Sequence, residues 1–185
     1  MKYLNRVLLA LLLIFEVNSL HASSIDDDTL EIYSKILPRL IFMSSQKEKI
    51  DKSLQICILR DDIDENSALT LIEKVTSHYP KGIKKYNIEF VQSNYTNVTL
   101  CKQTQLAFMF TSDHKSFSDA IKSLNNYKVI TMSYDPKWLE YGVETSLFIG
   151  RRVMPYLNMK ALQKNGIEFD NILLRVSKIY QEGVQ

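Results

Sequence analysis

The sequence predicts a single α/β domain with a mostly parallel central sheet, flanking helices and a late antiparallel hairpin. Short apolar runs alternate with segments of helical periodicity along most of the chain, and two strand-like runs near its carboxyl end are separated by a Gly-Arg turn. Strands that alternate with helices favour crossover connections and parallel pairing, whereas closely spaced strands favour a hairpin. The 185 residues include only 5 Gly and 4 Pro and show no repeat or linker, so one domain is expected.

Residues 1–22 have the pattern of a cleaved secretory signal peptide. Lys2 and Arg6 precede an unbroken apolar run at 7–15, and small and polar residues surround Ala22. This run is too short to cross a bilayer, which requires about 20 apolar residues, and no cysteine closely follows it as a lipid attachment site. We expect export across the inner membrane, with residues 23–185 as the exported domain. An uncleaved membrane anchor or a buried helix is the alternative.

Helical and strand patterns alternate through the first half of the exported domain. Apolar residues recur at helical spacing from Leu30 to Ile41, which predicts a first helix that bends near Pro38. The next elements are expected in this order: a buried strand at 54–59, a helix over 67–77 with Leu69, Leu71, Ile72 and Val75 inward, a turn at 81–85, and strands at 86–91 and 106–110. The intervening helix favours parallel pairing of the strands that it connects.

The second half continues the alternation and then adds the hairpin. The expected elements are a helix over 116–124, a strand at 129–132, a helical turn at 138–141 closed by Gly142, strands at 145–149 and 153–159, and a helix over 160–165 that stops at Gly166. A last helix is expected after Asp170, with these residues facing the core: Ile172, Leu173, Val176 and Tyr180.

The two cysteines, Cys57 and Cys101, are expected to form a disulfide. Exported chains meet an oxidising compartment in which paired thiols persist, and two cysteines allow one connectivity. The bridge would close a loop of about 45 residues and add roughly 4 kcal/mol in the chain-entropy model. Two free, buried thiols are the alternative. A metal pair is disfavoured, because neither cysteine has a His or Cys partner nearby in sequence.

Motifs for nucleotide binding and nucleophilic catalysis are absent from the sequence. It lacks a G-x-G-x-x-G after a strand, a phosphate-binding G-x-x-x-x-G-K-[ST] and a G-x-S-x-G elbow. His78 and His114 lack metal-ligand spacing and are expected to be structural or solvated. The net charge of +2 provides no strong attraction for nucleic acid or anionic lipid. We therefore expect no catalytic residue, metal, cofactor or nucleic-acid partner.

Four acidic residues follow the first strand: Asp61, Asp62, Asp64 and Glu65. Open α/β sheets often bind ligands at the carboxyl ends of their strands, and Asp113 follows the third strand. The arrangement superficially resembles the acidic pocket of a phosphorylated receiver domain. An exported domain has no cytoplasmic phosphate donor, however, and the lysine expected at the end of a later strand is not evident. We therefore interpret the acids as a solvated turn at a helix N-terminus, stabilised by the helix dipole.

Residues of the C-terminal third occur in an order found in one protein family. The matching segments are Lys128 to Ser133, Trp138, Gly142, Arg152-Val153, Leu157-Asn158-Met159, Ala161, Gly166-Ile167 and Leu173-Leu174. This order resembles the YfiR-like family of periplasmic regulators. Its members show a strand ending in Val-Ser-Asp, a Gly-containing turn, Arg-Val-x-Phe-x-Ile-Asn-Leu, Ala-x-x-x-Ala-Gly-Leu and a final helix with Leu-Leu. The spacing fits without a gap from Arg152 to Leu174, and the positions of Cys57 and Cys101 are similar to those of the family.

The chain departs from the family pattern at three places. Gly142-Val143 stands where the family has Gly-Gly, Pro155 stands where it has an aromatic residue, and the Trp-Pro often seen after its first helix is missing. Four residues that match the family motifs are expected to have structural roles: Gly142, Arg152, Asn158 and Gly166. The resemblance therefore implies the fold and the class of protein better than it implies a binding site.

The resemblance implies a periplasmic regulator without catalytic activity. Members of the family hold an inner-membrane diguanylate cyclase inactive by contacting its periplasmic sensor portion, and release raises cyclic di-GMP and promotes biofilm. Such a contact needs exposed aromatic or apolar anchors, for which Trp138, Tyr141 and Tyr156 are candidates. Core packing is the alternative for each of the three.

Three hypotheses follow for the function. In the first, the protein restrains an inner-membrane signalling protein, either a diguanylate cyclase or a sensor kinase. The sequence leaves open whether it forms a homodimer. In the second, it is a periplasmic small-molecule-binding sensor that serves a histidine kinase or a transport system, and a deep pocket with convergent polar groups would favour it. The third is an enzyme, which the lack of a catalytic set disfavours.

Overall fold

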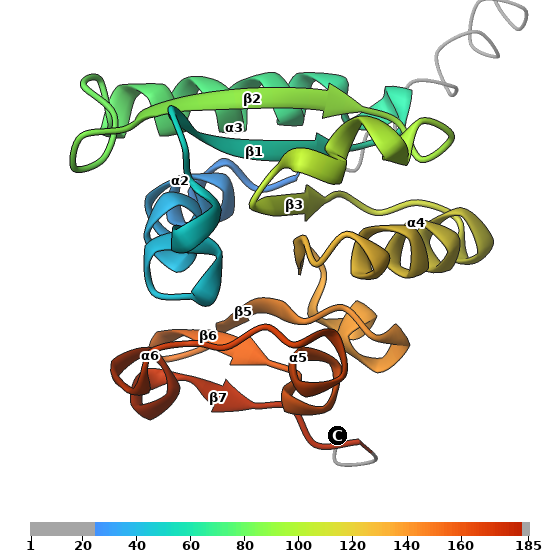
Figure 1. The fold of residues 1–185 in the computed structure, drawn as a ribbon. Helices are drawn as coiled ribbons and strands as arrows, with labels where there is room; N and C mark the ends of the chain where they lie inside the picture. The colour runs from blue at the N-terminus through green and yellow to red at the C-terminus, as the bar shows by residue number, and fades with distance from the viewer. Residues whose placement is uncertain (1–24, 183–185) are drawn as a thin grey trace, which may run out of the picture.

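The computed structural model describes residues 25–182, and the expected signal peptide at 1–22 lies outside this range. Its strands are β1 (Ser53–Leu59), β2 (Asn87–Ser93), β3 (Leu106–Met109), β4 (Ile130–Ser133), β5 (Thr145–Ile149), β6 (Val153–Leu157) and β7 (Lys178–Ile179). They form a sheet in the order β2-β1-β3-β4-β5-β6-β7 (Figure 1). Neighbouring strands are parallel except for β5 and β6, which are antiparallel. The predicted fold class, a mostly parallel sheet with a late hairpin, is confirmed.

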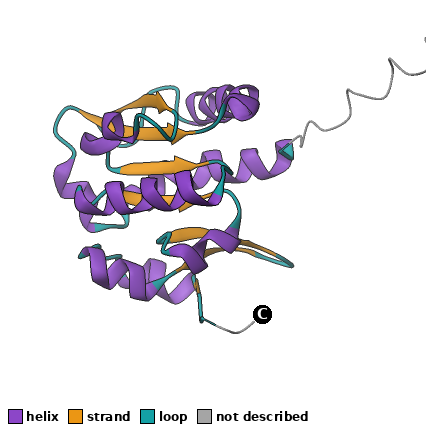
Figure 2. Ribbon diagram, turned by 90° about the vertical axis from the view of Figure 1, so that its right-hand side faces the viewer, coloured by secondary structure: helices purple, strands orange, loops and turns teal. Residues whose placement is uncertain are grey.

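The helices cover both faces of this sheet (Figure 2). The α-helices are α2 (Asp27–Phe42), α3 (Glu65–His78), α4 (His114–Asn126), α5 (Met159–Asn165) and α6 (Asn171–Val176), and the 3₁₀ segments are η1 (Ser45–Lys49), η2 (Asp62–Asp64), η3 (Val98–Gln103) and η4 (Pro136–Tyr141). One core cluster lies between the sheet and α2, α3, α5 and α6, and a second lies between the sheet and α4, η3 and η4. Within residues 25–182, no helix combines the length and the apolar character needed to cross a membrane.

Strand β1 shows why both faces are covered. Ile56 and Ile58 belong to the core under α2 and α3, whereas Cys57 and Leu59 belong to the core under α4 and η3. All four side chains are fully buried. Successive side chains of a strand point to opposite faces, and a central parallel strand is buried on both. This packing explains the continuous apolar run in the sequence.

The chain leaves the centre of the sheet in two directions. From β1 it crosses through α3 to β2 on one side, and from β3 it crosses through α4 to β4 on the other. The two helices lie on opposite faces, as right-handed crossovers in opposite directions require. The connections after β1 and β3 therefore diverge at the carboxyl ends of these strands, which is where open α/β sheets bind ligands.

Helix α2 joins the amino-terminal end of the described chain to this carboxyl edge. Its N-cap is Asp26, whose side chain accepts a hydrogen bond from the backbone N–H of Thr29 (3.1 Å), and the helix continues past Pro38. Its buried Tyr33 donates its hydroxyl to the carbonyl oxygen of Tyr134 (2.8 Å), just beyond β4. The start of α2 is thereby held beside the loop that follows β4.

The end of the chain differs from the sequence prediction. Helix α6 ends at Val176 instead of continuing to Tyr180, and only Leu173 of the four residues expected to face the core is buried. Ile172 is 71% exposed, and the following residues pair with β6 as β7. The free edge of β6 offers backbone groups that need partners, and pairing with them replaces the expected helical turn.

Two smaller differences concern single positions. Strand β6 ends at Leu157 rather than Met159, because Asn158 caps α5 and starts a helix there. Leu69 of α3 is exposed, whereas Leu71 and Val75 face the core as expected.

Candidate functional site

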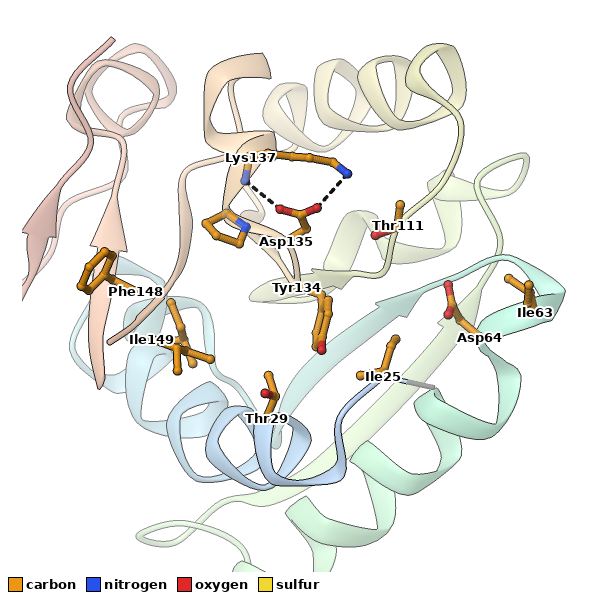
Figure 3. Close-up of a pocket in the computed structure, with 12 residues that line it drawn as sticks. Ile25, Thr29, Ile63, Asp64, Thr111, Tyr134, Asp135, Lys137, Phe148 and Ile149 are labelled. Carbon is orange, nitrogen blue, oxygen red and sulfur yellow. Dashed lines mark hydrogen bonds and ion pairs between the residues drawn. The ribbon is translucent and has the colours of Figure 1, made fainter. Parts of the chain in front are cut away.

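An open cavity lies at the carboxyl edge of the parallel strands (Figure 3). Its volume is about 710 Å³, within the range of small-molecule sites. Its walls come from segments that follow neighbouring strands: Asp64 after β1, Thr111 after β3, Tyr134 to Lys137 after β4, and Leu147 to Ile149 at the end of β5. Ile25 and Thr29 close the side formed by the start of α2. The topology thus gathers residues from distant parts of the sequence at one site.

Asp64 is the polar group that distinguishes this cavity. The residue is only 8% exposed, and its carboxylate points into the cavity from the end of η2 (Figure 3). The carboxylate does not cap α3, and it has no hydrogen bond or ion pair with any residue from 25 to 182. Burial raises the pKa of the Asp64 carboxyl above its ordinary value, the nearby charge of Asp61 raises it further, and Arg60 opposes the change.

The other charged groups of the cavity wall neutralise each other. The Lys137 ammonium lies 2.8 Å from a carboxylate oxygen of Asp135, and the Lys137 backbone N–H donates to the same carboxyl group (3.0 Å). The Arg60 guanidinium, which is not part of the wall, pairs with Glu65 at 2.9 Å. Asp64 is therefore the uncompensated charge among the residues that line the cavity.

The acids that follow β1 have different environments. Asp62 and Glu65 are exposed and contact Arg60, so the interpretation as a solvated turn describes them well. It is wrong for Asp64, because the single turn of η2 directs Asp62 outward and Asp64 inward. Asp113 caps α4, where its carboxylate accepts hydrogen bonds from two backbone N–H groups at 3.0 Å each.

Trp138 lies in the core rather than on the surface. It is 4% exposed, and its ring stacks on Phe117 with the centroids 3.9 Å apart. Core packing, the alternative reading of this residue, describes its position, so the structure corrects the expectation that Trp138 is an exposed anchor. The reason is that η4 folds against α4, a contact between segments that the local sequence pattern does not reveal.

Tyr141 and Tyr156 are more accessible than Trp138. Tyr141 is 42% exposed at the end of η4. Tyr156 is half-buried, and its ring meets that of Tyr180 at a centroid distance of 5.8 Å. Tyr180 and Tyr141 line a second cavity of about 500 Å³ between α4, α5 and the end of the chain. We call Tyr141, Tyr156 and Tyr180 the tyrosine face. The sequence predicted that Tyr180 faces the core, so it did not identify Tyr180 as part of the tyrosine face.

Cys57 and Cys101 form a disulfide that joins β1 to η3. Their Cα atoms are 5.5 Å apart, and both residues are fully buried in the core under α4. The bridge connects positions separated by 44 residues in the sequence. It therefore ties the central strand to the segment that leads into β3.

Three of the four family-motif residues shape local turns. Gly142 (φ 95°) and Gly166 (φ 65°) end η4 and α5 in the left-handed conformation, which glycine adopts without strain. The buried Asn158 accepts a hydrogen bond from the N–H of Ala161 (3.0 Å) and donates one to a carbonyl of η4 (2.8 Å). Arg152 is exposed at the tip of the β5–β6 hairpin.

Glu144 is a buried carboxyl that sequence reasoning missed. It has no exposed surface, and its carboxylate accepts hydrogen bonds from the N–H of Thr131 (2.7 Å) and the side-chain amide of Asn165 (2.5 Å). Burial raises its pKa to about 7, although these hydrogen bonds oppose the change. A single acid between the apolar Val143 and the strand that follows was the available signal. This residue joins β4, β5 and α5.

The two histidines of the described chain lie outside the cavity. His78 ends α3, and its Nε2 lies 2.8 Å from Oε1 of Glu31. His114 starts α4, and its ring meets Tyr141 edge-on at 4.4 Å between centroids. Among residues 25–182, no three His, Cys, Asp or Glu side chains are placed to hold a metal ion.

Two solved structures share this fold at low sequence identity. A conserved domain protein from Vibrio cholerae O1 biovar El Tor aligns with a TM-score of 0.59 at 9% identity, over 82% of this chain and 60% of that one. An ABC domain from Streptococcus pneumoniae, in complex with L-Trp, aligns with a TM-score of 0.61 at 13% identity, over 80% of this chain and 62% of that one. At this identity the likeness shows the fold alone, and the chain spans about three fifths of the length of either structure.

A family model described as YfiR/HmsC-like matches residues 39–178. The match runs from within α2 to the start of β7 and includes the disulfide, the cavity wall apart from Ile25 and Thr29, and the C-terminal motif residues. No curated protein matches the chain in sequence. The family match confirms the resemblance that the C-terminal third indicated, and the chain belongs to the YfiR/HmsC-like family.

Proposed function

We propose that this protein acts in the periplasm as a binding regulator that restrains an inner-membrane signalling enzyme, a diguanylate cyclase. The observation that carries the proposal is the match to the YfiR/HmsC-like family, whose members are periplasmic regulators of such enzymes. The disulfide between Cys57 and Cys101 fits an oxidising compartment. No chemistry of its own is required, because binding alone performs the regulation.

The physical basis of restraint is differential affinity. A regulator biases a two-state partner only by binding one state more tightly, and about 1.4 kcal/mol of preference changes the ratio of states tenfold. We propose that the tyrosine face provides this contact, because aromatic side chains with partial exposure serve as anchors in protein interfaces. Tyr141 is the most exposed of the aromatic residues that the sequence singled out.

Loss of the protein should activate the partner enzyme. Deleting the gene should raise cyclic di-GMP and surface attachment, and an exported copy should restore both to the original level. A copy with Tyr141→Ala should restore them less completely. Tyr127→Ala is the matched control, because Tyr127 is also 42% exposed but lies at the end of α4, outside the tyrosine face.

Two results would contradict parts of this proposal. If deletion leaves cyclic di-GMP unchanged while a kinase pathway responds, the cyclase is the wrong partner and the regulator class stands. If Tyr141→Ala and Tyr127→Ala restore regulation equally well at equal protein level, the contact lies elsewhere on the surface.

Delivery to the periplasm depends on residues 1–22. We propose cleavage near Ala22, which would leave Ser23 or Ser24 as the first residue. Intact mass of the protein released by osmotic shock should match one of these two chains. Recovery of the full-length chain in the membrane fraction would contradict export by this route.

A second function, a small-molecule sensor, is favoured by the cavity at the carboxyl edge of the sheet. Its position follows the general rule for ligand sites in open α/β sheets. One structure with this fold is described in complex with L-Trp, which indicates that the architecture can accommodate a small ligand. A ligand in the cavity would then report on the periplasm to a kinase or a transport system.

A further inference from the structure

We infer that the cavity at the carboxyl edge of the parallel sheet binds a small organic cation, a protonated amine with an apolar body, and that Asp64 is its counter-ion. The inference rests on the proposed sensor function, and it is independent of the restraint of a signalling enzyme. It names a residue and a ligand class for a cavity that the family match leaves unassigned.

The charged residues that line the cavity are the first argument for a cationic ligand. Asp64 is 8% exposed as a residue, and its side chain faces the cavity without a hydrogen bond or ion pair among the described residues. Asp135 and Lys137, the other charged residues of the wall, are paired with each other. The wall therefore has one uncompensated negative charge, and a buried carboxylate is stabilised by an opposite charge within about 4–6 Å.

A structural explanation for Asp64 would require partners that this residue does not have. The same chain shows how it treats a carboxyl group that is buried for structure. Glu144 accepts hydrogen bonds from Thr131 and Asn165, so both of its oxygens are satisfied. The Asp64 carboxylate accepts no hydrogen bond from a described residue, and its oxygens contact only the open cavity. The exception points to a partner supplied from outside the chain.

The rest of the wall fits an apolar body. Ile63 and Ile149 stand on opposite rims and are 73% and 49% exposed, which is unusual for large apolar side chains (Figure 3). Ile25 and the ring of Tyr134 lie between them, and Leu147 also lines the cavity. A site with a mainly apolar lining and a single charged group selects a ligand by its charge and its size.

Direct binding to the exported protein tests the inference. The probes are 2-phenylethylamine and 3,3-dimethylbutylamine, each compared by calorimetry with a neutral analogue of the same shape, 2-phenylethanol and 3,3-dimethylbutanol. At least one amine should bind about tenfold or more tightly than its analogue, as expected for a charged partner in a buried site. Asp64→Asn should reduce the affinity for that amine to the level of the analogue.

Two further variants test whether amine binding depends on the charge of Asp64 itself rather than on the net charge or the folding of the protein. Asp62→Asn removes a neighbouring exposed charge and should leave amine binding unchanged. Ile149→Lys places a cation on an exposed rim position and should weaken the amine more than the neutral analogue. This second variant keeps the test decisive if Asp64→Asn does not fold.

Three outcomes would overturn the inference. They are equal binding of amine and analogue, unchanged amine binding in both Asp64→Asn and Ile149→Lys, and no binding of either amine at millimolar concentration. The restraint proposal fails separately, through an unchanged level of cyclic di-GMP after gene deletion. Amine binding without that phenotype would support the cavity site and reject the restraint.

Discussion

The two halves of the sheet are held together by different chemistry. In the first half, β1 pairs with β2 along its whole length and with β3 over four positions, and a disulfide joins β1 to η3. In the second half, β4 and β5 share a single paired position, Met132 with Thr145. Side chains replace the missing backbone ladder there: Glu144, Thr145 and Ser146 bond to Thr131 and Ser133.

This difference shows how a sheet tolerates diverging strands. Where β4 and β5 separate, their backbone groups would be buried without partners, and buried polar groups of this kind are rarely left unpaired. The polar side chains satisfy them, so the second half depends on a few residues rather than on a continuous ladder. The first half depends on backbone pairing and a covalent bond, and it leaves Asp64 available at its carboxyl edge.

Removal of Glu144 should cause the largest loss of stability. Glu144→Ala leaves the N–H of Thr131 and the amide of Asn165 buried without an acceptor, which should cost about 2–6 kcal/mol of unfolding free energy, at about 1–3 kcal/mol for each donor. Urea denaturation measures the change. Glu140→Ala, at an exposed position of η4, should change the value by less than about 0.5 kcal/mol. Equal effects of the two substitutions would show that Glu144 does not hold the second half together.

Loss of the disulfide should destabilise the first half by a similar or smaller amount. The double variant Cys57→Ala and Cys101→Ala should lose roughly 2–5 kcal/mol of unfolding free energy, because the unfolded chain regains the freedom of the closed loop. Peptide mapping without reductant should identify the linked pair. A reductant should lower the Tm of the natural chain and leave that of the variant unchanged. The same response in both proteins would rule out a stabilising bridge.

Glu144 should make the stability of the protein depend on pH. The pKa of Glu144 is raised from 4.5 to about 7 by burial, so the folded state keeps a proton that the unfolded state loses. The resulting stability is fully present below pH 4.5 and is lost as the pH rises toward 7, by up to roughly 1.4 kcal/mol per pH unit. Urea denaturation at both ends of this window measures it, with Glu144→Gln as the variant that does not titrate. A constant difference between the two proteins would place the pKa of Glu144 near its ordinary value.

Neutralising Asp64 should have the smallest effect on stability, and the sign should be opposite to that for Glu144. Burial raises the pKa of Asp64, so its charged form disfavours folding at pH 7 and Asp64→Asn should stabilise the protein by less than about 1 kcal/mol. Thermal and urea denaturation without added amine provide the measurement. A loss of more than 1 kcal/mol would assign Asp64 a structural role like that of Glu144.

Much of the fold follows from local patterns in the sequence. Runs such as Leu54 to Leu59 have the composition of buried strands, and positions such as Gly142 and Gly166 mark helix ends at which only a left-handed residue fits. The candidate site is less predictable. The sequence shows the acidic residues after β1, but it does not show which of them faces the cavity. Asp62 and Asp64 differ in the direction in which η2 points their side chains.

The sequence by itself determined the α/β class, the order of most elements and the resemblance to a regulator family, because these depend on local periodicity and on the order of residues along the chain. Tertiary structure alone decided that Trp138 is buried, that β7 follows α6 where a longer helix was expected, and that Asp64 faces a cavity while Glu144 is enclosed by donors. Each of these depends on which distant segment lies opposite the residue. That partner is chosen by sheet order and helix packing, which bring residues far apart in sequence into contact.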